Sequence, residues 1–428
     1  MLMRQEGSRF RALSLLLTVG AVASCGSVSL NGNDAALPPD NDANMLPPVD
    51  VASGDDTTMP PPEDAPPDSL CGMGMPIAGA SLPAGFCARL FAKVAEPRTL
   101  ALAPNGDIFV GAPSLSTPGG SSGGLGAIIV LSDDNHDGIA EQQKFLDGVA
   151  DVHGLAIGGG FLYFTTSADI FRTPYASGQR KETGPRESLH LPAAYNTGGR
   201  WTHGLAHSVG GQLITSRGEY GACGSDPGGE ISRVDLSGAT GPMTLASAFR
   251  NPMYLRCHSA DEVCGATELG EDLAIGAKEK FLLIKPNTNY GYPCCYGQNK
   301  PIGSATSGTN CQNITAEEAS FTLSETPFGF DWERGLWPAP YRGGIFVALH
   351  GSAYSTTAWQ GARVVWAPTD PTTHAPTAAW SDFMGGFATE NLKRPTDVVF
   401  SPDGRMFLAD DQGGQVYWIA PLSLSIKQ

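Results

Sequence analysis

The chain has 428 residues, and its 43 acidic against 27 basic side chains give a formal net charge of −16 at pH 7. This excess of negative charge opposes binding to a phosphate backbone, so no nucleic-acid partner is expected. The part of the chain after residue 70 is long enough to bury a large hydrophobic core.

The first 24 residues have the pattern of an export signal. Three arginines among the first eleven residues precede the uncharged, mostly apolar run 12–23, which is too short to cross a bilayer as a helix. Small residues then lead to Cys25, and this box resembles a bacterial lipobox. We therefore expect an exported lipoprotein, held on the membrane only by a lipid on Cys25; an ordinary signal peptide with an incidental cysteine is the alternative. Gly26 and Ser27 stand where an inner-membrane retention signal would show Asp, which favours the outer membrane, facing the periplasm or the outside.

Residues 25–70 form the next segment, and its composition predicts a disordered linker. Residues 26–70 contain nine prolines and nine acidic residues, with no Lys or Arg. Such a segment cannot bury enough apolar surface to offset its chain entropy. We expect an extended tether between the lipid and a folded domain over residues 71–428.

Eight cysteines remain after Cys25, an even number in a chain sent to an oxidising compartment, so four disulfides are predicted. A metal site is the rival interpretation, but the sequence contains no CxxC or HExxH pattern. The two adjacent cysteines are not expected to bond to each other, because that strains the peptide. Proximity in the chain favours pairing of Cys71 with Cys87, of Cys257 with Cys264, and of Cys311 with either Cys294 or Cys295.

The folded part repeats one pattern of strand, glycine-containing turn and strand. Asn-Gly and Asp-Gly turns, flanked by apolar alternation, are strong hairpin signals. No long segment with helical periodicity follows Cys71. Six such units predict an all-β, six-bladed β-propeller, with seven blades as the alternative. The copies begin at Pro97, Val152, Thr202 and Pro395, with two degenerate copies at Pro252 and Pro327.

Residues just before each innermost strand of a propeller point into the mouth of the central channel. Here these positions are polar or charged, where a scaffold alone would need small apolar residues. A solvated rim would explain any single one of them, but five in register indicate a site. By repeat position they are Arg98, His153, His203, Arg250 with Asn251, and Arg394.

Over nearly all of residues 80–420, the sequence resembles the glucose/sorbosone dehydrogenase family of quinoproteins. No single matching segment is specific, but their order along the chain is. The segments are LPAGFC from Leu82, RNP from Arg250, NYGYPCCYG from Asn289, YRGGIFVALHGS from Tyr341, and the stretch from Arg394 through Asp410 and Asp411.

The resemblance implies a propeller that binds pyrroloquinoline quinone (PQQ) and Ca2+ at its channel mouth. Family members oxidise the C1 hydroxyl of aldoses or related sugars: a histidine takes the hydroxyl proton while hydride passes to the quinone. The substrate would be a small sugar or alcohol, and the electrons would go to a further acceptor. The alternative is a catalytically silent propeller that binds carbohydrate or protein. A lactonase-type propeller ranks lowest, because it needs a channel ringed by carboxylates.

Several residues match family positions at the cofactor pocket. Planar, bidentate arginines suit the three carboxylates of PQQ. The two tyrosines of the matching loop either wall the site or pack the loop, and the His-Gly-Ser string is expected in the pocket wall and not in a catalytic triad. The resemblance thus implies a cofactor site with Arg250, Asn251, Arg394, Tyr290 (with Tyr292) and His350.

The proton acceptor departs from the family pattern. The family histidine falls on Arg200 here, and the usual family arginine falls on His203. Arginine cannot act as a base near neutral pH. Either His203 has taken over the role, or His153 at the equivalent position of the preceding blade serves, or the chemistry is lost. A histidine at the mouth can also be a purely structural hydrogen-bonding group.

An acidic turn gives a separate signal. Asp133, Asn135, Asp137 and Glu141 occupy positions one, three, five and nine of a calcium loop, but Lys144 stands at position twelve, where a bidentate Glu is expected. A weak structural calcium site and a metal-free Asx-type turn both fit this pattern.

Overall fold

The structure is a computed structural model. Within the residues that it describes, no helix is long and apolar enough to span a membrane. The export signal, Cys25, the linker up to residue 68 and Arg200 lie outside the described residues. Those described are 69–114, 125–190, 201–219, 221–224, 228–270, 277–302, 309–351, 361–389 and 391–425.

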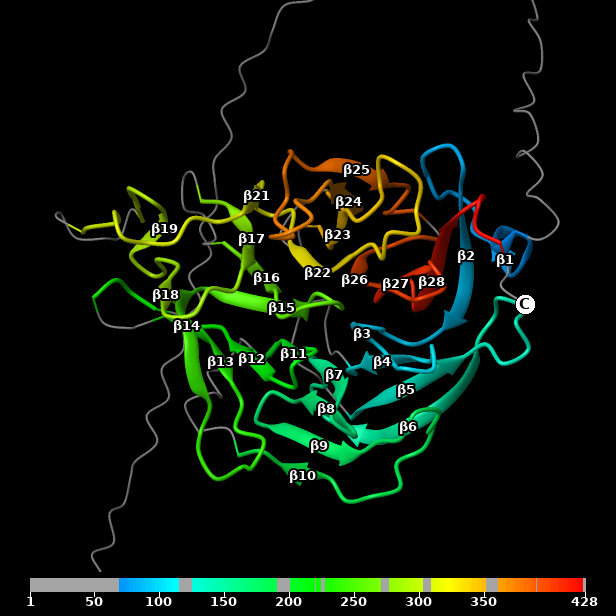
Figure 1. Cartoon of the computed structure of the whole chain (residues 1–428), viewed down its shortest axis with the longest axis horizontal. Helices are drawn as coiled ribbons and strands as arrows, with labels where there is room; N and C mark the ends of the chain where they lie inside the picture. Colours follow the sequence, from blue (N-terminus) through cyan, green and yellow to red (C-terminus); the bar gives the residue numbers. More distant parts are fainter. Residues whose placement is uncertain are drawn as a thin grey trace, which may run out of the picture. The chain divides into compact units, whose positions relative to one another are not determined.

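Six sheets of four or five strands form the blades of a β-propeller (Figure 1). The first blade comprises β3 (Thr99–Leu102), β4 (Ile108–Ala112), β5 (Gly126–Ser132) and β6 (Glu141–Val149). The second comprises β7 (Leu155–Gly158), β8 (Phe161–Thr165), β9 (Ile170–Pro174) and β10 (Glu187–Ser188). The third comprises β11 (Leu205–His207), β12 (Leu213–Arg217), β13 (Gly229–Arg233), β14 (Met243–Phe249) and the parallel strand β18 (Thr288–Asn289).

The remaining blades follow the same order from the inside outward. The fourth comprises β15 (Asn251–Cys257), β16 (Cys264–Leu269), β17 (Glu279–Leu283) and β21 (Ala319–Phe321). The fifth comprises β22 (Pro327–Trp332), β23 (Ile345–Leu349), β24 (Arg363–Ala367) and β25 (Ser381–Met384). The sixth comprises β26 (Pro395–Phe400), β27 (Met406–Asp410), β28 (Gln415–Pro421), β2 (Phe86–Lys93) and β1 (Met75–Pro76). Outside the blades lie the short hairpin of β19 (Cys295–Gly297) and β20 (Lys300–Pro301), and the 3-10 turn η1 (Leu70–Gly72).

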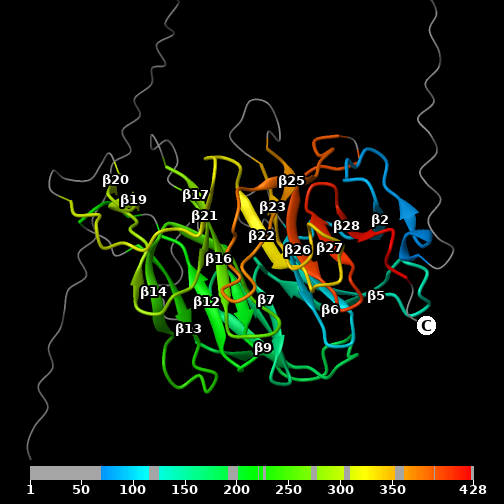
Figure 2. The ribbon, with the colours of Figure 1, turned by 45° about the horizontal axis from the view of Figure 1, so that its top comes forward.

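The innermost strands close into a ring. Each of β3, β7, β11, β15, β22 and β26 contacts the next, and β26 returns to contact β3. Figure 2 shows β22 and β26 side by side at one of these steps. The sixth blade is built from both ends of the domain, because β2 pairs antiparallel with β28 from Phe86↔Pro421 to Lys93↔Gln415. The six-bladed count predicted from the repeat is confirmed.

Local sequence explains the hairpins that join the inner strands to the second ones. Gly106 and Gly404 have φ of +93° and +92°, values that glycine adopts without cost. In both turns the amide two residues before the Asn or Asp bonds to the carbonyl two residues after it: Ala103 N–H to Asp107 O, and Ser401 N–H to Arg405 O, each at 2.9 Å. The first and last blades therefore use the same turn, as the repeat predicted.

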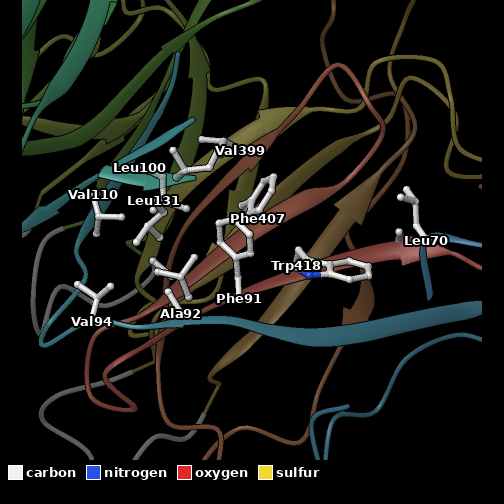
Figure 3. Packing of buried hydrophobic residues seen from close by; sticks show 14 of the residues in the cluster. Leu70, Phe91, Ala92, Val94, Leu100, Val110, Leu131, Val399, Phe407 and Trp418 are labelled. Atoms are coloured by element: carbon white, nitrogen blue, oxygen red, sulfur yellow. The ribbon is translucent and has the colours of Figure 1, made fainter. Parts of the chain in front are cut away.

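The core lies between neighbouring blades. Middle strands such as β23 and β27 are buried along their whole length because a blade packs on each face. Accordingly β23 is apolar throughout, and β27 is apolar up to its last residue, Asp410. The outer strand β6 is polar and mostly exposed. Figure 3 shows one layer, in which Phe91, Phe407 and Trp418 pack between the last blade and the first. Burying each such side chain contributes about 1.5–3 kcal/mol.

Four disulfides join the eight cysteines of the domain. Cys71–Cys87 and Cys257–Cys264 were predicted from proximity, and Cys311 bonds to Cys295, one of its two predicted partners. The adjacent cysteines do not bond to each other, as expected. Cys223–Cys294 completes the set.

The disulfides are expected to differ in their effect on stability. Cys223–Cys294 spans 71 residues and Cys257–Cys264 spans 7. Loop-closure entropy predicts that replacing the first pair by alanines costs about 4 kcal/mol and the second about 2 kcal/mol. Urea unfolding of the two double variants checks this. An equal or reversed order of the two losses would contradict the prediction.

Candidate active site at the channel mouth

The structure places the five predicted mouth positions where the inner strands begin. Arg98 precedes β3, His153 and His203 lie two residues before β7 and β11, and Arg394 precedes β26. Arg250 precedes β15, and Asn251 is the first residue of that strand. All are buried, with exposed fractions of at most 6%. Charged side chains this deeply buried are rare unless they are paired or hold a ligand.

One carboxylate organises the cationic side of the mouth. Asp411, directly after β27, accepts from Arg98 Nη1 at 2.5 Å and lies 3.1–3.2 Å from Nε2 of His350. Arg394 donates to the carbonyl oxygens of His350 and Gly351 at 2.9 and 2.5 Å. Three blades thus contribute to a single buried network of two arginines, one histidine and one aspartate.

The electrostatics of this network follow from burial and from the excess of cations. Burial lowers the pKa of His350 to about 3, so the ring is neutral at pH 7 and donates from Nε2 to the carboxylate. Burial alone would raise the pKa of Asp411, but His350 and Arg98 hold it well below its ordinary value. Burial also lowers the pKa of Arg394 to about 10. At pH 7 the network therefore has two positive charges and one negative charge, and it favours an anionic ligand.

Both ring nitrogens of His203 face backbone carbonyl oxygens. Its Nδ1 lies 3.0 Å from the Ser216 carbonyl oxygen and its Nε2 lies 3.4 Å from that of Ser167. Burial lowers its pKa, so the ring is neutral and has one lone pair at pH 7. That lone pair faces a carbonyl oxygen whichever tautomer forms. This geometry favours the structural role that was the alternative for His203.

In His153, by contrast, a carbonyl oxygen faces only one of the two ring nitrogens among the described residues. Its Nδ1 lies 3.3 Å from the His203 carbonyl oxygen, which fixes the proton on Nδ1. Nε2 has no hydrogen-bond partner within the described part of the chain. The ring packs edge-on against Trp201 and Tyr254, with centroids 5.7 and 5.0 Å apart. Burial, together with the charge of Arg98, lowers its pKa to about 3, so Nε2 presents a lone pair at pH 7.

Arg250 and Asn251 lie beside a second pair of buried charges. The Arg250 amide donates to Glu268 Oε1 at 2.6 Å, and Glu268 pairs with Lys280 at 3.2 Å. Asn251 Oδ1 is buried and has no hydrogen-bond partner among the described residues. An unpartnered buried oxygen is costly and often marks the place of a ligand or an ion.

Glu279 adds a titrating group near Arg250. Burial raises the pKa of its carboxyl to about 7, although amides of residues 324 and 326 and the charge of Arg250 oppose the shift. Because the folded pKa exceeds the unfolded one, the stability that this group contributes is complete below about pH 4.5 and is lost as the pH rises through 7.

The free energy of unfolding of Glu279→Gln, minus that of the unsubstituted chain, should therefore be larger at pH 8 than at pH 5. We expect an increase of roughly 2–3 kcal/mol. Urea unfolding at both pH values measures the difference. Glu187→Gln, at a side chain 48% exposed beside Arg172, is the control. A difference for Glu279→Gln that is the same at both pH values would show that this carboxyl does not titrate in the range.

The structure does not bring Tyr290 to the mouth. Its hydroxyl donates to the Leu283 carbonyl oxygen at 2.7 Å and its ring stacks on Phe249, within the core cluster of the third and fourth blades. Tyr292 accepts from the Gly221 amide at 3.1 Å. These contacts favour loop packing, the alternative to a role in the pocket wall. Arg200, the third predicted catalytic residue, lies outside the described residues.

The acidic turn uses its oxygens internally. Asp133 Oδ1 accepts from the Gly138 amide at 3.2 Å and its Oδ2 pairs with Arg405 at 3.0 Å. Asn135 Oδ1 accepts from the Asp137 amide at 3.1 Å, and Glu141 Oε2 accepts from the Asp134 amide at 3.3 Å. This is the hydrogen bonding of an Asx-type turn, which favours that alternative over a calcium loop.

Sequence reasoning missed three residues of the mouth. Asp411 stood in a matching segment but no role was assigned to it. Tyr254 donates to the Arg98 carbonyl oxygen at 2.8 Å, and Phe328 stacks on His350 and lies 4.6 Å below the Arg98 guanidinium. The pair of aspartates that ends the apolar run of β27, Asp410 and Asp411, was the one available signal, and it concerned Asp411 alone among these three residues.

No protein-family model matches this sequence, and no curated protein matches it. Solved structures match with low identity but high coverage. The iodide structure of the family AA12 enzyme of Trichoderma reesei has a TM-score of 0.66 at 17% identity, over 82% of this chain and 99% of that one. The holo PQQ domain of pyranose dehydrogenase from Coprinopsis cinerea has a TM-score of 0.63 at 18% identity, over 82% and 98%.

A bacterial structure gives the same result. The PQQ-bound aldose sugar dehydrogenase of Streptomyces coelicolor has a TM-score of 0.54 at 18% identity, over 79% of this chain and 99% of that one. The resemblance inferred from the sequence is thereby confirmed for the fold. Over nearly the whole described domain, this chain is a β-propeller similar to the PQQ-dependent sugar dehydrogenases and the AA12 enzymes.

Proposed function

We propose that this chain is a PQQ-dependent oxidoreductase that oxidises a hydroxyl of a sugar or related alcohol at the channel mouth. The observation that carries the proposal is the buried network of Arg98, Asp411, His350 and Arg394 beside His153, whose Nε2 has no hydrogen-bond partner among the described residues. This arrangement places positively charged groups that can bind an anion beside a neutral proton acceptor. The similar structures that contain PQQ support the choice of cofactor.

The residues present fit this cofactor by their chemistry. PQQ has three carboxylates, and planar guanidinium groups match carboxylates in bidentate geometry. Arg98, Arg250 and Arg394 supply such groups at the starts of three inner strands. The positive balance of the network is reduced when an anion binds, which lowers the cost of burying these charges.

Each residue then has a defined task. Oxidation of a CH–OH group to C=O releases a hydride and a proton. When bound, PQQ supplies the two-electron acceptor for the hydride. His153 accepts the proton on Nε2, while the His203 carbonyl holds its Nδ1–H and so fixes ring and tautomer. Anionic groups beside Arg98 would offset the charge that lowers the pKa of His153, and so make the ring a stronger base.

Calcium is proposed as the second cofactor. Ca2+ takes oxygen ligands, including amide carbonyls of Asn. Asn251 Oδ1, buried and unpartnered among the described residues, is an oxygen of this kind at the mouth. A calcium structure exists for the similar Trichoderma reesei AA12 enzyme. We further propose that a lipid on Cys25 anchors the protein at the outer membrane, with electrons passing to a further acceptor.

Titration of the purified protein with PQQ in excess Ca2+, followed by dye reduction with a panel of aldoses, tests the proposal. Saturable binding with sugar-dependent reduction is expected. Binding without reduction of dye by any sugar or simple alcohol would favour the silent propeller, in which Arg200 in place of the family histidine has abolished the chemistry. No binding of PQQ would refute the enzyme.

A further inference from the structure

Two loops from neighbouring blades bring two histidines and an aspartate together. His258 and Asp261 lie in the short turn between β15 and β16, and His374 follows β24 of the next blade. Asp261 Oδ2 is 2.7 Å from Nε2 of His374 and 3.4 Å from Nδ1 of His258. In the described part of the chain this is the one group of three or more His, Cys, Asp or Glu side chains whose ligand atoms all lie within 4.8 Å of one another.

We propose that His258, Asp261 and His374 bind one divalent transition-metal ion, and that Zn2+ is the ion that this ligand set fits. Two imidazole nitrogens and one carboxylate oxygen are ligands that Zn2+ takes, and three protein ligands leave one tetrahedral position for water. Ca2+ and Mg2+ prefer oxygen ligands alone. The Asp261 side chain is 40% exposed, so water reaches the site.

The surrounding structure holds the ligands in place, as it does in metal sites generally. The Cys257–Cys264 disulfide closes the turn that contains His258 and Asp261. Asp261 Oδ1 accepts from the Val263 amide at 2.9 Å, which leaves Oδ2 for the histidines. Trp332 Nε1 donates to the His374 carbonyl oxygen at 3.1 Å, and His374 has a φ of +58° that few residues adopt.

The rings of His258 and His374 are in direct contact. They stack with centroids 3.7 Å apart and planes inclined by 19°. Binding an ion must tilt the rings apart from this stacked contact, because two in-plane lone pairs then converge on one point.

The ion would join the fourth and fifth blades at the end of the inner strands remote from the mouth. Arg250 leads into β15, whereas His258 follows its last residue. Cys257 and Ser259, on either side of His258, line the cavity of about 220 Å³ that runs along the inner strands. His153 of the proposed catalytic mouth also lines this cavity, but none of the three proposed ligands belongs to the mouth, so the test of the metal site does not require PQQ.

Isothermal titration of the untagged, chelator-treated protein with Zn2+ tests the proposal. We expect one Zn2+ ion per chain, a higher Tm with Zn2+, and no displacement of the bound Zn2+ by Ca2+. Co2+ in place of Zn2+ should give the visible absorption of a tetrahedral site. The affinity for Zn2+ should fall by about tenfold or more in His374→Ala and in Asp261→Asn.

Asp261→Asn keeps the size of the side chain, so it separates loss of a ligand from loss of folding, and circular dichroism checks both variants. His190→Ala, at an exposed histidine after β10, is the control and should bind like the unsubstituted chain. The proposal fails if Zn2+ does not bind, if both ligand variants bind it unchanged, or if Ca2+ competes equally.

Discussion

His153→Gln is expected to bind PQQ almost as the unsubstituted protein does, yet to reduce dye about 10²–10⁴-fold more slowly. Glutamine keeps a polar side chain beside the His203 carbonyl but cannot take a proton at neutral pH. The loss should therefore lie in kcat, with KM for the sugar changed little. Steady-state dye reduction over a range of pH, with the PQQ affinity measured separately, checks this.

His203→Gln is the matched comparison. Both ring nitrogens of His203 face carbonyl oxygens, so this variant should lose stability but keep kcat within about tenfold of the unsubstituted value. If His203→Gln abolished turnover while His153→Gln retained it, the base would be His203, as the repeat register also allowed.

Asp411→Asn is expected to lower the free energy of unfolding by about 3–5 kcal/mol, because it leaves the buried Arg98 charge uncompensated. The side chains of Arg98 and Asp411 are only 2% and 3% exposed. The pKa of Asp411 is lower in the folded protein than in the unfolded chain, where it is near 4. The stability that Asp411 contributes is therefore present above pH 4 and is lost as the pH falls toward the folded-state pKa. Urea unfolding at pH 7 measures the effect.

The control for Asp411→Asn is Asp147→Asn. Asp147 pairs with Lys144, and both side chains are more than half exposed, so the loss of stability should be far smaller than that of Asp411→Asn. Equal losses of stability in Asp411→Asn and Asp147→Asn would contradict the prediction. Addition of PQQ to Asp411→Asn should also restore part of the loss if an anion binds at Arg98.

The fold could be predicted from the sequence because its signals are local. The glycine turn after Ala103 and its copy after Ser401 depend on a few neighbouring residues. The same register correctly placed Arg98, His153, His203 and Arg394 just before inner strands. The pairing of Cys311 with Cys295 rather than Cys294 was left open, because spacing alone does not distinguish adjacent cysteines.

The site was less predictable because its interactions cross between blades. The carbonyl oxygens that face the ring nitrogens of His203 belong to Ser216 and Ser167, in two other parts of the chain. The repeat register alone therefore could not show that His203 and His153 have different surroundings. Tyr290 matched a family segment, but its hydroxyl finds a partner within its own loop region. Asp261 and His374 are far apart in sequence, and no spacing pattern connects them.

The pairing of β2 with β28 has a consequence for biosynthesis. The ribosome delivers these two strands at opposite ends of the propeller's synthesis, so the ring cannot close while the chain is still growing. Until β28 arrives, β2 has an unpaired edge that can join another copy of the chain. A chaperone that keeps the nascent domain from associating, and a slow closing step dominated by long-range contacts, are therefore expected features of how this protein reaches its folded state.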